Sequence, residues 1–347
     1  MTRFIQLHLL TPYHPSNLNR DDLGRPKTAL MGGVQRLRIS SQSLKRAWRK
    51  SELFQEALKG HLGTRTKEMG KDILKSLKAK GVAEKKAQDW AGQIAAVFGK
   101  PKKDEAKLEI EQLAHFSPEE EEAIEALCQK LAQTKEAPGE EDLKLLRRSD
   151  SAVDIAMFGR MLAASPAYNT EAAVQVAHAV TVHQATVEED FFTAVDDLNQ
   201  GLEDVGAAHM GEIEFGAGLF YLYLCVDRAL LQDNLAARPD LAGRALRALA
   251  EVAATVAPTG KQASFASRSY AQYLLAEKGD RQPRSLAAAF LEPVSGTDQL
   301  GLAIKKLEQT RARMEQAYGP LADDHQVMNV SAEDGTLAQI LDFVGEG

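Results

Sequence analysis

Residues Arg36 to Lys50 read RLRISSQSLKRAWRK, with six basic side chains and no acidic one. The stretch begins like a short strand, and its paired serines are typical helix N-caps. Beyond them, Leu44, Ala47 and Trp48 recur at the i, i+3, i+4 spacing of a buried helix face. The stretch therefore predicts a strand that leads into an amphipathic helix, which we expect to reach Lys59.

The basic side chains of this helix form two columns on its outward face. Lys45 precedes Arg49 by four residues, and Arg46 precedes Lys50 by four. Cations near a helix start are unusual, because the macrodipole favours acidic residues there by roughly 0.3 to 1 kcal/mol. A phosphate bound among free N–H groups, serine hydroxyls and cations would account for them. A solvated basic helix face is the alternative.

Charge is distributed unevenly along the 347 residues, of which 44% are hydrophobic. The formal net charge is −7, yet residues 1–50 carry +8 and the remainder carries −15. The chain is long enough for one large or two ordinary domains with a proper core. This asymmetry predicts one anion-binding surface on an otherwise acidic body.

Cysteine content and hydropathy indicate the cellular environment in which the protein would fold. Cys128 and Cys225 are far apart and support neither a disulfide framework nor a metal site, so we expect both to be buried packing residues. The longest apolar run, Ala217–Val226, is about half of a membrane span, and the N-terminus lacks a signal pattern. We expect a cytoplasmic protein that does not engage a membrane.

Hydrophobic periodicity predicts strands and helices along the whole chain. The predicted strands are Phe4–Leu10, Val174–Val182, Ala217–Val226 and Tyr270–Leu275. Beyond the basic helix, the predicted helices are a module over residues 60–154, then Ala242–Val256, Asp298–Tyr318 and Gly335–Phe343. Ser117 to Glu120 has the composition of a capping box. Thr11–Gly33 is predicted to be a long loop, and Glu188–Gly211 a polar excursion.

Without the helical module, the order of elements is strand, helix, strand, strand, helix, strand. This order is typical of ferredoxin-like and RNA-recognition domains. We therefore predict an α+β fold, with a ferredoxin-like palm interrupted by a large helical insertion. Such folds often bind RNA, but the fold alone does not establish a function.

No established catalytic or metal-binding motif is present. The sequence lacks GxxxxGK, GxGxxG after a strand, HExxH and any His/Cys cluster at metal-ligand spacing. His178 and His183 are five residues apart on a predicted strand, which would place them on opposite faces. We expect no metal, no cofactor and no enzymatic activity.

The sequence contains a set of distinctive motifs: LNRDD at 18–22, the Gly32-Gly33 turn, RISSQSLKRA at 38–47, VDIA at 153–156 with GRM at 159–161, and FTAVDDL at 192–198. Together they resemble the CasC family, the CRISPR RNA-binding backbone subunit of type I-E Cascade in the RAMP superfamily. The resemblance implies a palm at residues 1–59, 155–187 (with the thumb base) and 212–347, helical fingers at 60–154 and a protruding thumb at 188–211. The thumb is longer than in the family, with Gly201–Val205 as extra residues.

The resemblance also implies which residues hold nucleic acid. Phosphate contacts give affinity without reading bases, as a variable guide requires. The implied RNA-binding residues are Arg20, Lys27, Ser40, Gln42, Ser43, Lys45, Arg46 and Arg49 in the palm, and Lys261 and Gln262 in a further loop. The residues implied to wedge against bases are Met161, Phe192 and Val195.

The implied partners are CRISPR RNA, the target DNA strand paired to it, further copies of this chain and other Cascade subunits. Guide pairing would read the sequence, and the protein would hold the strands. A RAMP-type ribonuclease that uses Asp21 or Asp22 is the first alternative. A small-molecule phosphate enzyme that uses the helix start at Ser41 is the second.

Overall fold

The computed structural model describes residues 2–102, 108–147, 151–194, 209–236 and 238–346. The chain divides into two compact units. The sheet unit comprises residues 1–54, 176–226 and 246–347, and the helical unit comprises residues 55–175 and 227–245. The palm, finger and thumb boundaries drawn from the sequence remain a prediction.

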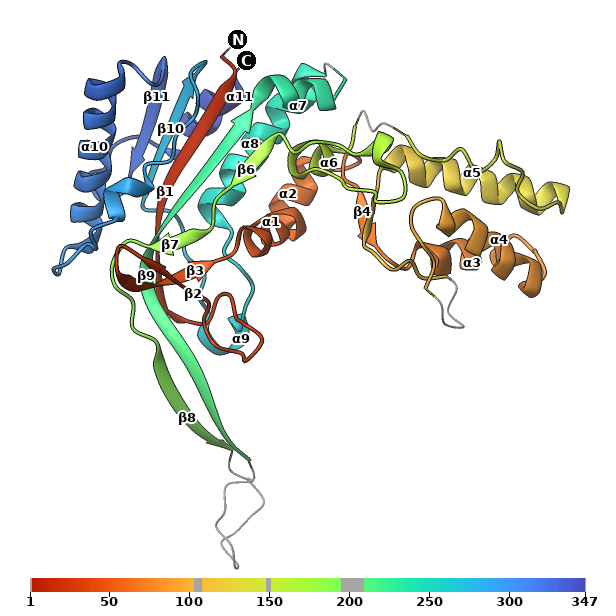
Figure 1. The fold of residues 1–347 in the computed structure, drawn as a ribbon, viewed down its shortest axis with the longest axis horizontal. Helices are drawn as coiled ribbons and strands as arrows, with labels where there is room; N and C mark the ends of the chain where they lie inside the picture. The colour runs from red at the N-terminus through yellow and green to blue at the C-terminus, as the bar shows by residue number, and fades with distance from the viewer. Residues whose placement is uncertain (1, 103–107, 148–150, 195–208, 237, 347) are drawn as a thin grey trace, which may run out of the picture. The chain divides into compact units, whose positions relative to one another are not determined.

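Nine of the described strands form one sheet (Figure 1). Its main path runs β11, β10, β1, β9, β7, β3, β2, and β6 and β8 also pair with β9. The strands are β1 (Phe4–Ser16), β2 (Thr28–Met31), β3 (Val34–Ile39), β6 (Val174–Val176), β7 (Ala179–Thr181), β8 (Glu188–Ala194), β9 (His209–Asp227), β10 (Tyr273–Gly279) and β11 (Asp324–Asn329). With α1 before β7 and α8 before β10, the predicted α+β, ferredoxin-like order is confirmed.

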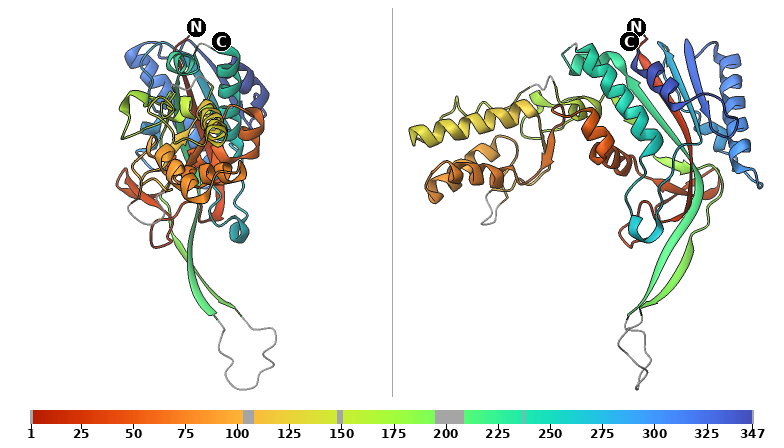
Figure 2. Two further views of the ribbon diagram at one scale, coloured as in Figure 1. Left: turned by 90° about the vertical axis from the view of Figure 1, so that its right-hand side faces the viewer. Right: turned by 180° about the vertical axis from the view of Figure 1, so that it is seen from behind.

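Helices cover both faces of this sheet. On one face, side chains of β1, β9 and β10 share a buried cluster with Phe290 of η2 (Ala287–Phe290) and Leu307 of α10 (Gln299–Tyr318). The other face is covered by α1 (Ser41–Lys50) and by the part of α8 (Pro239–Thr255) that belongs to the sheet unit (Figure 2). Near the C-terminus, α11 (Leu337–Gly345) contacts β10 and β11.

β1 is buried on both faces, although its alternating sequence predicted a half-buried strand. Leu7 and Leu9 are at most 2% exposed, and Gln6 and His8, which point the other way, are equally buried. The prediction was wrong because β1 lies between β10 and β9 in the middle of a covered sheet.

The predicted loop Thr11–Gly33 is shorter than expected. β1 continues to Ser16, and β2 pairs with β3 through a two-residue turn at Gly32 and Gly33. Both glycines have positive φ, +61° and +78°. Such a turn matches the twist of the flanking strands and favours glycine at both positions.

The basic helix ends earlier than predicted. α1 stops at Lys50, and α2 (Glu52–Ala57) starts after the extended residue Ser51. The Ser51 hydroxyl donates to the Trp48 carbonyl and accepts from the Phe54 N–H, so one side chain terminates the first helix and caps the second. Two strand predictions also change: Val174–Val182 is interrupted at residues 177–178, and the strand predicted from Tyr270 begins at Tyr273.

The helical unit has its own buried core. Its helices are α3 (Met69–Ala79), α4 (Glu84–Ala96), α5 (Pro118–Thr134), α6 (Val153–Phe158), η1 (Pro166–Tyr168) and α7 (Arg228–Asn234). The capping box of α5 is confirmed, since Ser117 and Glu120 exchange side-chain-to-backbone bonds. β4 (Thr64–Thr66) and β5 (Ala114–Phe116) form a small sheet that the sequence did not predict. Cys128 and Cys225 are buried, as expected.

Among the described residues, no helix combines the length and apolarity needed to cross a membrane.

A buried ionic network ties β1 and β10 to the helices on one face of the sheet. The Glu277 carboxylate is fully buried, accepts from Arg284 and lies 3.0 Å from Nε of Arg311. It also lies 3.2 Å from Nε2 of His8, whose Nδ1 lies 2.9 Å from the Tyr221 hydroxyl. The Tyr221 oxygen accepts a hydrogen bond from the Leu286 N–H, so the hydroxyl proton of Tyr221 can be donated to Nδ1 of His8. A neutral His8 protonated on Nε2 therefore satisfies every contact.

The pKa values of this network follow from burial and hydrogen bonding. Burial alone would raise the pKa of Glu277, but hydrogen bonds from His8 and Arg284 outweigh it and hold that pKa well below its usual range. Burial lowers the pKa of His8, although Glu277 opposes that shift. The network is thus an ionised carboxylate between two arginines, next to a neutral histidine.

We predict that Glu277→Gln lowers the free energy of unfolding by about 3–5 kcal/mol, because it removes the buried counter-charge of Arg284 and the shortest ion pair of Arg311, which keeps only its longer pairs to Glu308 and Glu315. Urea unfolding would measure the loss. The matched control is Glu292→Gln, since Glu292 is 86% exposed and, among the described residues, its carboxylate pairs only with Lys306, at 2.8 Å. Equal losses in the two variants would contradict this account of the network.

We predict that stability falls as the pH drops below about 6.5, the ordinary histidine pKa. The unfolded chain binds a proton at residue 8 in that range, whereas the folded chain, with its lowered His8 pKa, does not. Urea midpoints between pH 7.5 and pH 5 would show the decline. His8→Gln keeps a donor and an acceptor without titrating, and it should reduce the slope, leaving the part that His61 and His178 contribute through their own lowered pKa values; an unchanged slope would contradict the assignment.

Candidate nucleic-acid interface

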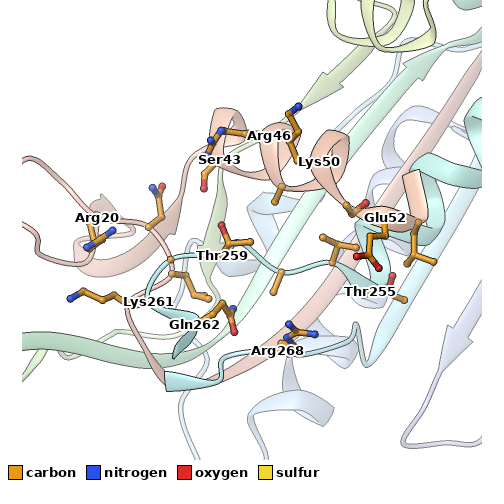
Figure 3. A pocket seen from close by; sticks show the side chains of 18 of the residues that line it. Arg20, Ser43, Arg46, Lys50, Glu52, Thr255, Thr259, Lys261, Gln262 and Arg268 are labelled. Carbon is orange, nitrogen blue, oxygen red and sulfur yellow. The ribbon is translucent and has the colours of Figure 1, made fainter. Parts of the chain in front are cut away.

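A hollow of about 1290 Å³ lies within the sheet unit (Figure 3). Three segments form it: the loop after β1, the α1 helix with the start of α2, and the stretch after α8. Its lining includes Arg20, Asp21, Asp22, Ser43, Arg46, Lys50, Glu52, Thr255, Thr259, Lys261, Gln262, Arg268 and Tyr270. The hollow is therefore built from residues as far apart in the sequence as Leu18 and Tyr270.

The hollow carries an excess of unpaired positive charge. Its five cations are Arg20, Arg46, Lys50, Lys261 and Arg268. In the described part of the chain, none of these five side chains forms an ion pair or a side-chain hydrogen bond. The site can thus neutralise several negative charges of a ligand without first breaking bonds within the protein.

One acidic residue of the lining, Asp21, stabilises a turn. Oδ1 of Asp21 accepts from the Leu23 and Arg25 N–H groups at 3.0 and 2.9 Å, which closes the turn that carries Arg20. Within the described residues, no three His, Cys, Asp or Glu side chains are grouped so that they could hold a metal ion.

Side chains already occupy much of the start of α1. Ser40 is the N-cap, as predicted, and its hydroxyl accepts from the Ser43 N–H at 3.3 Å. The Ser41 N–H donates to Nδ1 of His178 at 3.2 Å, and the Ser40 N–H donates to Asn19 at 2.8 Å. The chain thus supplies its own acceptors for the N–H groups of Ser40, Ser41 and Ser43, and phosphate binding at this helix start stays a prediction.

His178 explains the interruption between β6 and β7. Its ring turns to the start of α1, where Nδ1 also lies 3.3 Å from Nη1 of Arg38. Burial lowers the pKa of His178, and the nearby cations Arg38, Lys27 and Lys45 lower it further. The ring is therefore neutral, and Nδ1 accepts. Lys27 and Lys45 form a second basic group, beside this histidine.

The two basic columns of α1 have different surroundings. Arg46 and Lys50 line the hollow with Ser43, whereas Lys45 and Arg49 are half-buried outside it. Of the predicted RNA-binding residues, the hollow brings together Arg20, Ser43, Arg46, Lys261 and Gln262. Lys27, Ser40, Gln42, Lys45 and Arg49 lie outside its lining.

The turn that carries Lys261 is tightly constrained. α9 (Gln262–Phe265) is a single helical turn between two residues with positive φ, Lys261 at 52° and Ala266 at 48°. Such strain persists only where the surroundings hold it. Here the Gln262 amide donates to the Pro258 carbonyl and the Ser267 hydroxyl at 3.0 and 3.1 Å. Lys261 is thus presented by a rigid loop.

The sequence matches the model of the family of CT1975-like proteins over residues 5–343. The chain belongs to this family. A chain from a solved structure described as a CRISPR RNA-guided surveillance complex, pre-nicking, is 30% identical, with a TM-score of 0.83 over 98% of this chain and 99% of its own length. Another, described as a CRISPR RNA-guided surveillance complex, shares the fold at 24% identity, with a TM-score of 0.75 over 98% and 99% of the two chains. The search of curated proteins found no match.

Two cations of the hollow, Lys50 and Arg268, were not among the RNA-binding residues predicted from the sequence. Lys50 follows Arg46 by one helical turn, so the i, i+4 spacing already contained the signal. Arg268 had no such signal, because only the path of the chain after α9 brings it to the hollow.

The residues predicted to wedge against bases lie in different parts of the chain. Phe192 is half-buried on β8 and stands opposite Gly211 of β9, where an added Cβ would come within 2.5 Å of its ring. Met161 belongs to the helical unit and is 74% exposed. Val195 and the extra thumb residues 201–205 lie outside the described residues.

We predict that Gly260→Ala displaces the turn before α9. A Cβ there would meet the backbone oxygens of Leu18 and Asn17 at 2.4 and 2.9 Å. The expected cost is about 1–3 kcal/mol in urea unfolding, together with weaker binding of polyanions. Gly139→Ala is the control, since its Cβ would meet only an Asp142 oxygen, at 3.8 Å. Unchanged stability and binding in Gly260→Ala would contradict this prediction.

Proposed function

We propose that the chain binds CRISPR RNA, independently of its sequence, as the repeated backbone subunit of a type I-E Cascade surveillance complex. The membership in the CT1975-like family supports this proposal. So does the 30% identity, over 98% of the chain, to a chain from a CRISPR RNA-guided surveillance complex. The CasC-like motifs carry the finer assignment to type I-E.

The observation that carries the proposal is one hollow of the sheet unit with five cations that form no ion pair among the residues the structure describes. A single-stranded RNA backbone is a regular polyanion, and neutralising its phosphates releases counterions. Arginine and lysine contacts to phosphate carry no sequence information, so one surface serves every guide. The −15 charge of residues 51–347 would disfavour binding of RNA elsewhere on the chain.

The assembly around the RNA is part of the same proposal. Further copies of the chain would follow one another along the guide, other Cascade subunits would bind the ends, and the target DNA strand would pair with the exposed guide bases. The backbone subunit would hold strands without cleaving them. The two hydrogen bonds that Asp21 accepts within its own turn support a structural role for this carboxylate over a catalytic one.

We predict that Arg46→Glu and Arg268→Glu each weaken binding of a fluorescein-labelled repeat–spacer RNA at least tenfold, equally for two unrelated spacers. Each lost phosphate contact should also reduce the slope of log K against log salt by about 0.7 to 1. Fluorescence anisotropy from 50 to 300 mM salt measures both quantities. Arg313→Glu, an equal charge change at an exposed position of α10, is the matched control.

Intact binding by both hollow variants would overturn the proposal, and so would an equal loss in the Arg313→Glu control. A second test concerns assembly. Co-expression with repeat–spacer RNA and the neighbouring genes should yield a large particle containing RNA of defined length, detected by light scattering and the 260/280 nm ratio. A nucleic-acid-free monomer that does not bind added guide RNA would contradict the proposed role.

A further inference from the structure

The thumb hairpin, formed by β8 and residues 209–215 of β9, has two chemically different faces. Cross-strand partners share a face, and so do residues two apart on one strand. The register pairs Glu189 with Glu214 and Phe191 with Glu212, so one face carries three carboxylates around Phe191. Glu214 pairs with Arg25, whose Nε lies 3.2 Å from Oε1 of Glu214, whereas Glu189 and Glu212 are exposed, so this face keeps a net negative charge.

The opposite face carries three apolar side chains beside two carboxylates. The register places Phe192 against Gly211, Asp190 against Ile213 and Glu188 against Phe215. The side chains of Phe192, Ile213 and Phe215 are all partly exposed. At the base of the hairpin, the Phe215 ring meets the partly exposed ring of Phe265, with centroids 6.0 Å apart and planes inclined by 45°. Phe265 belongs to α9, so two separate elements form this aromatic pair.

Hydrogen bonds connect the segments that carry the aromatic pair to segments that line the cationic hollow. The Phe265 N–H donates to the carbonyl of Lys261, one helical turn away, at 3.0 Å. The Phe265 carbonyl accepts from Nε2 of His14 at 2.9 Å. On the strand side, the buried Asn17 amide donates to the carbonyls of Glu214 and Gly24 at 2.9 and 3.0 Å, which ties β9 beside Phe215 to the loop of Arg20.

We infer that Phe215 and Phe265 form a stacking platform for an unpaired base of the RNA held in the hollow. This inference rests on the proposed function. An aromatic ring stacks on any base, so the platform is compatible with binding that ignores sequence. The neighbouring cations Lys261 and Arg20 would hold the flanking phosphates. An unpaired nucleobase fits this combination of apolar rings and adjacent positive charge.

The first test uses RNA with a single 2-aminopurine, moved position by position through the spacer. Stacking quenches its fluorescence, so at least one position should be quenched on binding the wild-type chain. Phe265→Leu and Phe215→Leu should restore that signal, Phe265→Tyr should keep it quenched, and Phe265→Ala should weaken binding roughly 5- to 150-fold. Phe191→Leu is the matched control, because this 60% exposed ring lies on the acidic face.

The second test needs no variant. RNA carrying 5-iodouridine, irradiated on the wild-type chain, should crosslink to peptides containing residue 215 or 265. Crosslinks confined to other peptides would overturn the inference. So would quenching that is relieved by Phe191→Leu but not by Phe215→Leu or Phe265→Leu. If Arg46→Glu abolishes RNA binding while the platform variants bind and quench like wild type, only the platform inference fails. If the wild-type chain binds no RNA, the proposed function fails as well.

Discussion

The hollow depends on one close approach between two backbone segments. Gly260 lies directly against the carbonyls of Asn17 and Leu18, at a distance that leaves no room for a Cβ. Asn17 is 1% exposed and binds the carbonyls of Gly24 and Glu214, so the same residue also fixes the loop of Arg20 to β9. This contact holds together the loop after β1, the turn before α9 and the base of the β8–β9 pair.

Cations that face a common space repel one another, so the protein must hold them in place by other means. The rigid turn at α9, the Asp21 turn and the capped start of α1 each supply such support for one group of cations. None of these supports uses the cationic side chains themselves in the described structure. The positive charge thus remains available to a polyanion, while the structural bonds are made by neutral or acidic groups.

Much of the fold follows from local patterns. The Ser40 cap, the Ser117–Glu120 capping box and the Gly32-Gly33 turn are local features, and the structure contains each of them. The misjudged features depend on distant partners. The burial of His8 requires helices on both faces of the sheet, and the break at His178 requires the start of α1 beside it. The candidate site divides in the same way: the Arg46 and Lys50 column is visible in the helical spacing, whereas Arg268 is not.

The sequence by itself determined the class of the fold, the basic helix, the concentration of positive charge in the first 50 residues and the resemblance to CRISPR RNA-binding subunits. These features depend on composition and on spacings of a few residues, which are the same in any fold. The tertiary structure alone decided which cations face one hollow, that the start of α1 is closed by His178, and that Phe215 meets Phe265. Those facts arise from contacts between residues 50 to 250 positions apart, and such contacts exist only once the sheet has been assembled.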